Sequence, residues 1–223
     1  MSDQSTAARR NAIIIVGGGA QAAVVADILQ LAHAAGADWV AVGIVDDTPE
    51  LLGASVLGLP IIGPIASLAQ IAHDAVIVAV GDNHARRAIT ERLLAAGERM
   101  AIAIHPRACV ASSATIGIGS MICAGAVIAP RAVIGRGVII NTNASVDHDT
   151  IVDDFAHLSA GATVGGRARI GAETLIAIGA SVASNMTVGA RTVIGSGAAV
   201  VDPIPDDVVA FGVPARVRSD RKP

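Results

Sequence analysis

The sequence predicts two domains of different construction, an α/β domain over residues 1–106 and a solenoid of short strands over residues 107–223. Two observations support this. In the first domain, apolar runs alternate with stretches of helical periodicity, which is typical of a parallel sheet covered by helices. In the second, an aliphatic residue recurs at every sixth position from Val110 to Val200, with no insertion. A period of six fits neither an amphipathic helix nor a simple strand, but it fits a solenoid.

The α/β domain begins with a strand at residues 12–16 that runs into Gly17-Gly18-Gly19. We expect a Rossmann-like order of elements. Strands follow at residues 39–45, 59–62, 75–80 and 101–104, and helices at residues 21–35, 64–72 and 85–96. In the last of these helices, Arg86, Arg87, Glu91 and Arg92 are expected on the solvent face. His105-Pro106 marks the domain boundary, because the residue before a proline is pushed towards an extended conformation.

The solenoid domain is predicted from sixteen aliphatic positions six residues apart. The residue after each is usually small, as at Gly135 and Gly165, which suits a crowded corner or a positive φ. Three short strands form one triangular coil of 18 residues, so the series makes about five coils. Residues 18 apart then lie one above the other.

Composition excludes several classes of protein. Hydrophobic residues make up 52% of the chain and aromatic residues 1%, so the core is built from Ala, Val, Ile and Leu. Uncharged stretches at residues 51–73 and 108–130 are long enough to span a bilayer. The first contains Pro60 and Pro64 and the second belongs to the repeat, so we expect no membrane span. With a net charge of −3 and few aromatic residues, nucleic-acid binding is not expected.

The chain begins without an apolar segment typical of a secretion signal. Its two cysteines, Cys109 and Cys123, occupy different points of the six-residue frame and give neither a disulfide framework nor zinc spacing. These features favour a cytoplasmic protein.

The glycine turn at residues 17–22 fits the pattern G-x-G-x-x-A between a strand and a helix. Asp46 and Asp47 end the second strand, where a dinucleotide-binding fold places its ribose-binding acid. The motif alone indicates only backbone N–H groups at a helix start, which suit any phosphate. A nicotinamide cofactor and a nucleotide diphosphate both remain open.

The solenoid carries one polar segment, Asp147-His148-Asp149. A histidine flanked by carboxylates is held in orientation and serves as a general base near neutral pH. Gly166 lies one coil above His148, where its backbone N–H is placed to stabilise an oxyanion. His157 lies half a coil away from His148.

The second half of the chain resembles the hexapeptide-repeat acyltransferases, whose repeats form a left-handed parallel β-helix. The segment at residues 202–216, with Pro203, Pro205 and Gly212-Val213-Pro214, matches the tail that ends those domains. The whole chain is more closely similar to the PglD/NeuD-type nucleotide-sugar N-acetyltransferases. The glycine turn, Asn141-Thr142 with Asp147-His148-Asp149, and residues 154–159 carry this resemblance.

The resemblance implies a role for each of several residues. His148 is expected to be the catalytic base, with Asp149 and Asp147 as its carboxylates. The residues expected to bind acetyl-CoA are His157, Gly166, Ile178 and Arg216. Those expected to bind the nucleotide sugar are Gly17, Gly19, Ala20, Gln21, Asp46, Asp47 and Gly81. The family often has His where this chain has Gln21, and glutamine can hydrogen-bond but cannot titrate.

We therefore expect a homotrimer that uses acetyl-CoA and no metal. It would acetylate the 4-amino group of a nucleotide-linked amino-dideoxy sugar. A UDP-4-amino sugar and GDP-perosamine are both possible acceptors. Alternatives are a sugar O-acetyltransferase, a zinc carbonic anhydrase-like β-helix protein that uses three histidines, and an NAD-dependent enzyme or nucleotide sensor. We expect the N-terminal domain to determine which acceptor is used.

Overall fold

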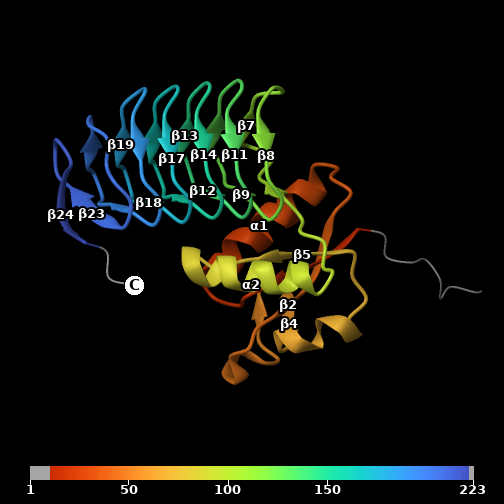
Figure 1. The fold of residues 1–223 in the computed structure, drawn as a ribbon. Coiled ribbons are helices and arrows are strands. Elements are labelled where there is room, and N and C mark those ends of the chain that lie inside the picture. The colour runs from red at the N-terminus through yellow and green to blue at the C-terminus, as the bar shows by residue number, and fades with distance from the viewer. Residues whose placement is uncertain (1–10, 221–223) are drawn as a thin grey trace, which may run out of the picture.

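The computed structural model describes residues 11–220 and shows an α/β unit beside a long stack of coils (Figure 1). The N-terminal sheet has the order β3-β4-β2-β1-β5. Its strands are β1 (Ala12–Val16), β2 (Val40–Val45), β3 (Ser55–Val56), β4 (Leu59–Gly63) and β5 (Ala75–Val78). All neighbours are parallel except β3 and β4, which form an antiparallel pair. The predicted parallel sheet is confirmed.

Helices cover both faces of this sheet because β1 is apolar on both sides. Ile13 and Ile15 pack in one cluster with α1 (Ala20–Ala34), and Ile14 and Val16 pack in another with α2 (Asn83–Ala95). Two short 3-10 helices, η1 (Pro49–Leu51) and η2 (Ile65–Gln70), complete the domain. The helix expected at residues 64–72 is thus only the tight turn η2.

The second unit is a left-handed parallel β-helix, which confirms the solenoid predicted from the sixfold series and the handedness implied by the family resemblance. In every strand from β7 to β22 the second residue is a member of the sixfold series. Each strand pairs in parallel with the strand 18 residues away, and the stack forms three sheets. The strands are Cys109–Val110, Thr115–Ile116, Met121–Ile122, Val127–Ile128, Val133–Ile134, Ile139–Ile140, Ser145–Val146, Ile151–Val152, His157–Leu158, Thr163–Val164, Arg169–Ile170, Leu175–Ile176, Ser181–Val182, Thr187–Val188, Val193–Ile194 and Ala199–Val200.

The corners explain why small residues follow the inward positions. A Cβ at Gly135 would lie 2.6 Å from Asp154 Oδ1 and 2.7 Å from the Asp154 amide nitrogen of the next coil. Close approach, and not a positive φ, therefore requires glycine there. The left-handed conformation falls two residues after Gly135, at Gly137 with φ 60°. The equivalent residue of the next coil, Phe155, has φ 59°.

Both ends of the β-helix are joined to other elements. The strand expected at residues 101–104 meets the α/β sheet only at its start, where the Ala101 amide donates to the Val76 carbonyl of β5 at 2.9 Å. Its last part, β6 (Ala103–Ile104), pairs with β9 (Met121–Ile122) of the β-helix. At the other end, β23 (Val208–Phe211) and β24 (Arg216–Asp220) form an antiparallel pair that extends the same sheet. No helix among residues 11–220 is long and apolar enough to cross a membrane.

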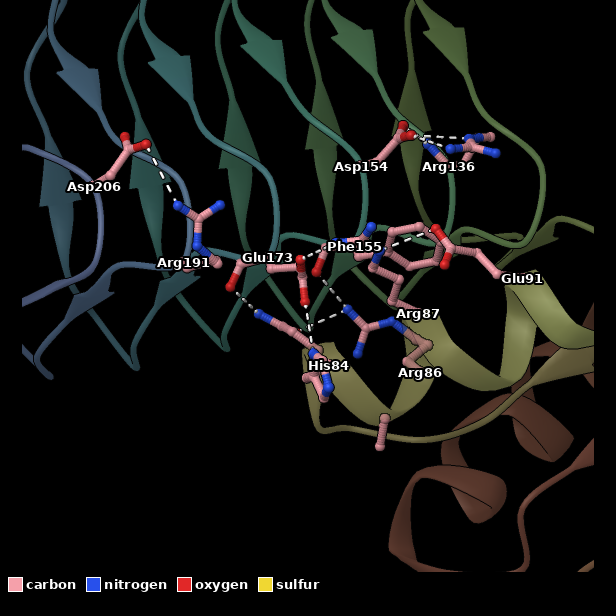
Figure 2. A network of polar contacts seen from close by, with 12 residues as sticks. His84, Arg86, Arg87, Glu91, Arg136, Asp154, Phe155, Glu173, Arg191 and Asp206 are labelled. Atoms are coloured by element: carbon pink, nitrogen blue, oxygen red, sulfur yellow. Dashed lines mark hydrogen bonds and ion pairs between the residues drawn. The ribbon is translucent and has the colours of Figure 1, made fainter. Parts of the chain in front are cut away.

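The two units share a buried junction. Val25 and Ile28 of α1 belong to one apolar cluster with Met121 and Ile139 of the β-helix. On the other side, α2 meets the coils through polar contacts (Figure 2). Arg86, expected on the solvent face of this helix, is fully buried in that junction. The expectation was wrong because the helix faces the coils, and not water, at this position.

Candidate active site

His148 lies at the corner between β13 (Ser145–Val146) and β14 (Ile151–Val152). Its Nδ1 is 2.8 Å from Asp149 Oδ2. Asp149 has a left-handed backbone with φ 60° and in turn accepts two hydrogen bonds from Arg131, at 2.6 and 2.8 Å. With Nδ1 bonded to a carboxylate, the neutral ring carries its proton on Nδ1 and leaves the Nε2 lone pair free.

The two aspartates beside His148 have different tasks. Hydrogen bonds from Arg131 and His148 hold the pKa of Asp149 well below its usual range, so this carboxylate stays charged. Asp147 does not contact the ring in this structure and instead accepts a hydrogen bond from the His148 backbone N–H at 2.7 Å. Asp149 orients the imidazole, whereas Asp147 braces the corner.

Gly166 lies directly against the imidazole, as the 18-residue stacking predicts. A Cβ added to Gly166 would be 2.7 Å from His148 Nε2 and 2.8 Å from Cε1. The neighbouring Arg167 amide donates to the His148 carbonyl at 2.9 Å and fixes the two coils in register. Among residues 11–220 the Gly166 N–H has no backbone or side-chain acceptor, so it is available to a ligand.

A groove of about 440 Å³ runs along the sheet that contains β13 and ends beside this corner. Small outward side chains such as Ser145, Thr163 and Ser184 line it, together with Asp147 and Gly165. A shallow groove with small walls accommodates an extended ligand that lies along the stack. Its position next to His148 makes it a candidate path for a co-substrate.

His157 occupies a different face of the β-helix. It is the outward residue of β15 (His157–Leu158), a neighbour of β12 and β18 in the sheet that also contains β6. The Asn141 side-chain amide lies 3.2 Å from Nε2, and the ring also has a hydrogen bond to the Gly81 backbone. Burial lowers the pKa of His157 to about 4, and the positive charge of Arg86 acts in the same direction. His157 is therefore neutral at physiological pH.

The structure does not bring His148 and His157 together within one chain. His157 faces the N-terminal unit, whose Gly81 and Arg86 surround it. His148 lies at the corner between the two other sheets, whereas the N-terminal unit packs on the sheet that contains β9 and β12. The two histidines thus lie on different sides of the triangular stack.

The glycine turn has the geometry expected of a ligand-binding loop. Gly17 has φ +103°, and a Cβ there would lie 3.0 Å from the Ala79 carbonyl oxygen, so glycine is required. Gly19 precedes the first residue of α1, Ala20, and supplies no side-chain cap. The first amides of α1 therefore face outward from the carboxyl end of β1, which favours an anion.

The remaining residues expected to bind the nucleotide surround this turn but also hold the protein together. Asp46 accepts hydrogen bonds from the Gly18 and Thr48 amides at 2.6 and 2.7 Å. Asp47 accepts one from the Ile65 amide at 2.8 Å. The Gln21 side chain points towards the β-helix, where its Nε2 is 3.7 Å from Met121 Sδ.

Gly81, Ile178 and Arg216 are placed apart from one another. Gly81 follows β5, and its carbonyl accepts a hydrogen bond from Arg86 at 3.0 Å. Ile178 is 63% exposed at a corner of a later coil. Arg216 begins β24 and pairs with Asp202 at 3.0 Å. No group of three or more metal-ligating side chains occurs within residues 11–220.

Sequence reasoning missed three residues of this site. Arg131 lies 18 residues before Asp149, so the coil register alone could have indicated the pair. Asn141 was named only among the residues that carry the family resemblance, not as a partner of His157. Arg86 carries no periodic signal, because its partners Gly137 and Phe155 belong to the other domain.

The fold and this corner define a hexapeptide-repeat acyltransferase, and comparisons with known proteins narrow the class. Residues 12–93 match the family model described as PglD N-terminal domain. A sequence comparison with curated proteins finds no match.

Solved structures resemble the whole chain. A mutant of perosamine N-acetyltransferase from Caulobacter crescentus, in complex with CoA and GDP-perosamine, is 33% identical with a TM-score of 0.88 and covers 95% of this chain and 98% of its own. The acetyltransferase domain of PglB from Neisseria gonorrhoeae is 39% identical with a TM-score of 0.86, covering 94% of this chain and 100% of its own. WeeI from Acinetobacter baumannii, 20% identical over 92% of this chain and 99% of its own with a TM-score of 0.70, shares the fold.

The chain belongs to the PglD/NeuD-type nucleotide-sugar N-acetyltransferases. It is an acetyl-CoA-dependent sugar N-acetyltransferase with a Rossmann-like domain and a left-handed β-helix.

Proposed function

We propose that the chain transfers the acetyl group of acetyl-CoA to the 4-amino group of a nucleotide-linked amino-dideoxy sugar, with His148 as the general base. The observation that carries this is the linked set Arg131, Asp149, His148 and Gly166. Asp149 binds Nδ1, so Nε2 is free to take a proton, and Gly166, whose N–H is unengaged, lies against the same ring. General base and oxyanion donor are thus adjacent on neighbouring coils.

In the proposed reaction, the sugar nitrogen attacks the thioester carbonyl carbon and forms the C–N bond. Nε2 of His148 removes the proton from that nitrogen, and Asp149 stabilises the resulting imidazolium. The Gly166 N–H stabilises the oxyanion of the tetrahedral intermediate. When the C–S bond breaks, the imidazolium returns the proton to the leaving sulfur, and free CoA and the amide are formed.

Direct transfer is favoured over an acyl-enzyme because neither cysteine is placed to act as a nucleophile. Burial raises the pKa of Cys123 to about 11, which suppresses its thiolate. Cys109 pairs with Val127, which pairs with Ser145, so it lies two strands from the His148 corner. At the usual strand spacing this separation is about 10 Å.

The substrates are assigned to two parts of the molecule. The turn that contains Gly17, Gly19, Ala20 and Gln21, together with Asp46, Asp47 and Gly81, is proposed to hold the nucleotide sugar. The amides at the start of α1 suit its diphosphate. Gly166, His157, Ile178 and Arg216 are proposed to contact acetyl-CoA. The Caulobacter relative, whose structure contains CoA and GDP-perosamine, supports this pair of substrates and makes GDP-perosamine the first acceptor to test.

The proposed assembly is a homotrimer in which one copy supplies His148 and another supplies the sugar. Within one chain, His148 lies at the corner between the two sheets on which its own N-terminal unit does not pack. His157 and Gly166 also lie on different sides. When copies associate side by side through their β-helix faces, His148 of one copy meets the nucleotide-sugar turn of another, and Gly166 of one copy meets His157 of another.

The test is acetyl transfer by the wild-type protein and by His148→Asn, with GDP-perosamine and a UDP-4-amino-4,6-dideoxy sugar as acceptors. Asparagine retains polarity but cannot take the proton, so kcat should fall about 10²- to 10⁴-fold with unchanged thermal stability. Near-normal turnover by His148→Asn would refute the base. Acetylation of a sugar hydroxyl in place of the amine would refute N-acetylation of the proposed acceptor.

A further inference from the structure

Arg86 is a buried cation at the junction between the two units, and the reaction proposed above gives it no role. Its side chain is fully buried, and all of its hydrogen-bond partners are neutral oxygen atoms. Burial lowers its pKa to about 10, so the guanidinium remains charged at neutral pH. A buried charge without a direct carboxylate partner is costly and is retained where it does specific work.

The guanidinium joins the two units directly (Figure 2). On its own side it donates from Nη1 to the carbonyls of Val80 and Gly81, at 2.9 and 3.0 Å. On the β-helix side, Nε donates to the Gly137 carbonyl and Nη2 to the Phe155 carbonyl, both at 2.8 Å. A fifth bond, 2.8 Å from Nη2 to the Asn83 side chain, satisfies the last of the five donors.

The contacts of α2 with the β-helix all fall at one corner of the coils. Gly137, Phe155 and Glu173 are stacked 18 residues apart, and all three have left-handed backbones, with φ from 57° to 60°. Arg86 binds the first two carbonyls, and the Asn83 amide donates to the third at 3.0 Å. Helix α2 is thereby attached to three successive coils in one register.

The loop that Arg86 holds is the one that contacts His157. The Gly81 carbonyl accepts a hydrogen bond from Arg86, and the Gly81 backbone also hydrogen-bonds the His157 ring. On the other side of the ring, the Asn141 carboxamide uses Oδ1 to accept from the Thr142 amide at 2.8 Å, which leaves Nδ2 to donate to His157 Nε2. The ring is therefore held between Gly81 and Asn141, with its proton on Nδ1.

We propose that Arg86 is a positioning residue for acetyl transfer: by binding carbonyls on both units, it fixes the loop at Gly81 against the β-helix and so orients His157. This inference rests on the proposed function, in which His157 contacts acetyl-CoA and Gly81 lies at the nucleotide-sugar site. Arg86 itself touches neither substrate. It sets the distance between the acceptor-binding edge and the β-helix.

The charge of Arg86 has a second consequence for the same ring. Arg86 is the charged group that acts on His157, and it opposes protonation of the imidazole. Asp82 and Glu173 act on Arg86 itself and favour its charged form. The Asn141 side chain on the other side is neutral. Removing the positive charge should therefore allow His157 to take up a proton at a higher pH.

The experiment compares Arg86→Met, which removes both charge and hydrogen bonds, with Arg86→Lys, which keeps the charge but offers three donors in place of five. Arg92→Met is the matched control, because Arg92 is exposed on the same helix. The readouts are kcat and KM against pH, and the ¹⁵N resonances of the His157 ring between pH 5 and 8 in the full-length protein.

In the wild type we expect one neutral tautomer throughout this range. In Arg86→Met, burial still lowers the pKa of His157, but without the nearby charge a larger fraction of the ring should be protonated at pH 5 than in the wild type. The value of kcat/KM should fall about 10- to 100-fold, because a small misplacement of reacting groups has an effect of this size. Arg86→Lys should keep His157 neutral yet lose about tenfold in kcat/KM. Arg92→Met should match the wild type.

A folded Arg86→Met variant with wild-type His157 resonances and an unchanged pH profile would overturn the proposal. If that variant does not fold, Arg86→Lys tests the proposal instead. A wild-type value of kcat/KM in the lysine variant would contradict the positioning role. Failure of the proposed function is recognised separately: the wild type would then not acetylate the amino sugar, while the resonances of His157 would still report on Arg86.

Discussion

The two histidines of the site are held in opposite ways. His148 is 40% exposed, and its Nδ1 is bonded to the ionised carboxylate of Asp149, which leaves Nε2 open. His157 is largely buried, lies near a positive charge and accepts a hydrogen bond on Nε2. The first environment suits a group that must gain a proton during turnover, and the second suits a group that must not.

The neutral state of His157 predicts how stability depends on pH. Its pKa in the folded protein is about 4, below the value of 6.5 expected when unfolded. Between these values the unfolded chain binds the proton and the folded chain does not, so stability is lost as the pH falls from 6.5 towards 4. At pH 5 the loss amounts to about 2 kcal/mol relative to neutral pH.

His157→Gln should remove that part of the pH dependence, and denaturation midpoints at pH 7 and pH 5 would measure it. His84→Gln is the control, because the His84 side chain is 81% exposed. A His157→Gln variant that loses as much stability between pH 7 and pH 5 as the wild type would contradict the buried neutral histidine.

At the scale of elements, the β-helix works because each two-residue strand supplies one inward and one outward side chain. The inward residues form the core, from Ile122 to Val200, with almost no exposure. The corner residues then determine which side chains the coil presents to a ligand. A non-glycine corner such as Asp149 presents a side chain, and a glycine such as Gly166 leaves space for the side chain of the coil below.

Gly166→Ala tests this contact between coils. The added methyl group would lie 2.7 Å from His148 Nε2, too close for van der Waals contact, so the imidazole must turn away. Since the displaced group is a half-exposed side chain, the fold should survive, while kcat should fall about 100-fold. Steady-state kinetics and a thermal melt measure both effects.

The His148→Ala background provides the control for this variant. If the clash with the ring is the cause, Gly166→Ala should affect stability less in His148→Ala than in the wild type. Equal destabilisation in both backgrounds would assign the effect to the backbone instead.

At the scale of the whole molecule, the two proposed half-sites of one chain face different directions. The glycine turn belongs to the unit that packs on the sheet of β6, β9 and β12 (Figure 1). His148 belongs to the corner between the other two sheets. A site shared between copies reconciles this separation with direct transfer from acetyl-CoA to a bound sugar.

Mixing two inactive variants tests the shared site. His148→Asn removes the base, and Gly19→Leu fills the open space at the glycine turn, where φ −78° and ψ −165° accept any residue. If the assembly is the proposed trimer, mixtures reassembled from equal amounts should regain about one quarter of wild-type activity, because both functional halves meet at one quarter of the interfaces. No recovery in verified mixed trimers would show that each chain completes its own site.

The sequence by itself determined the β-helix, its coil register, the glycine turn and the stacking of Gly166 on His148. These follow from local patterns: a sixfold repeat, or a strand followed by glycines and a helix. The tertiary structure alone decided that Arg86 is buried and that His157 faces Gly81. The contacts of Arg86 with Gly137 and Phe155 join residues 51 and 69 positions apart, and both sets of contacts connect two domains with unrelated periodicities. A repeat fixes which residues of its own coils meet, but only the packing of one domain on the other decides which of its faces is covered.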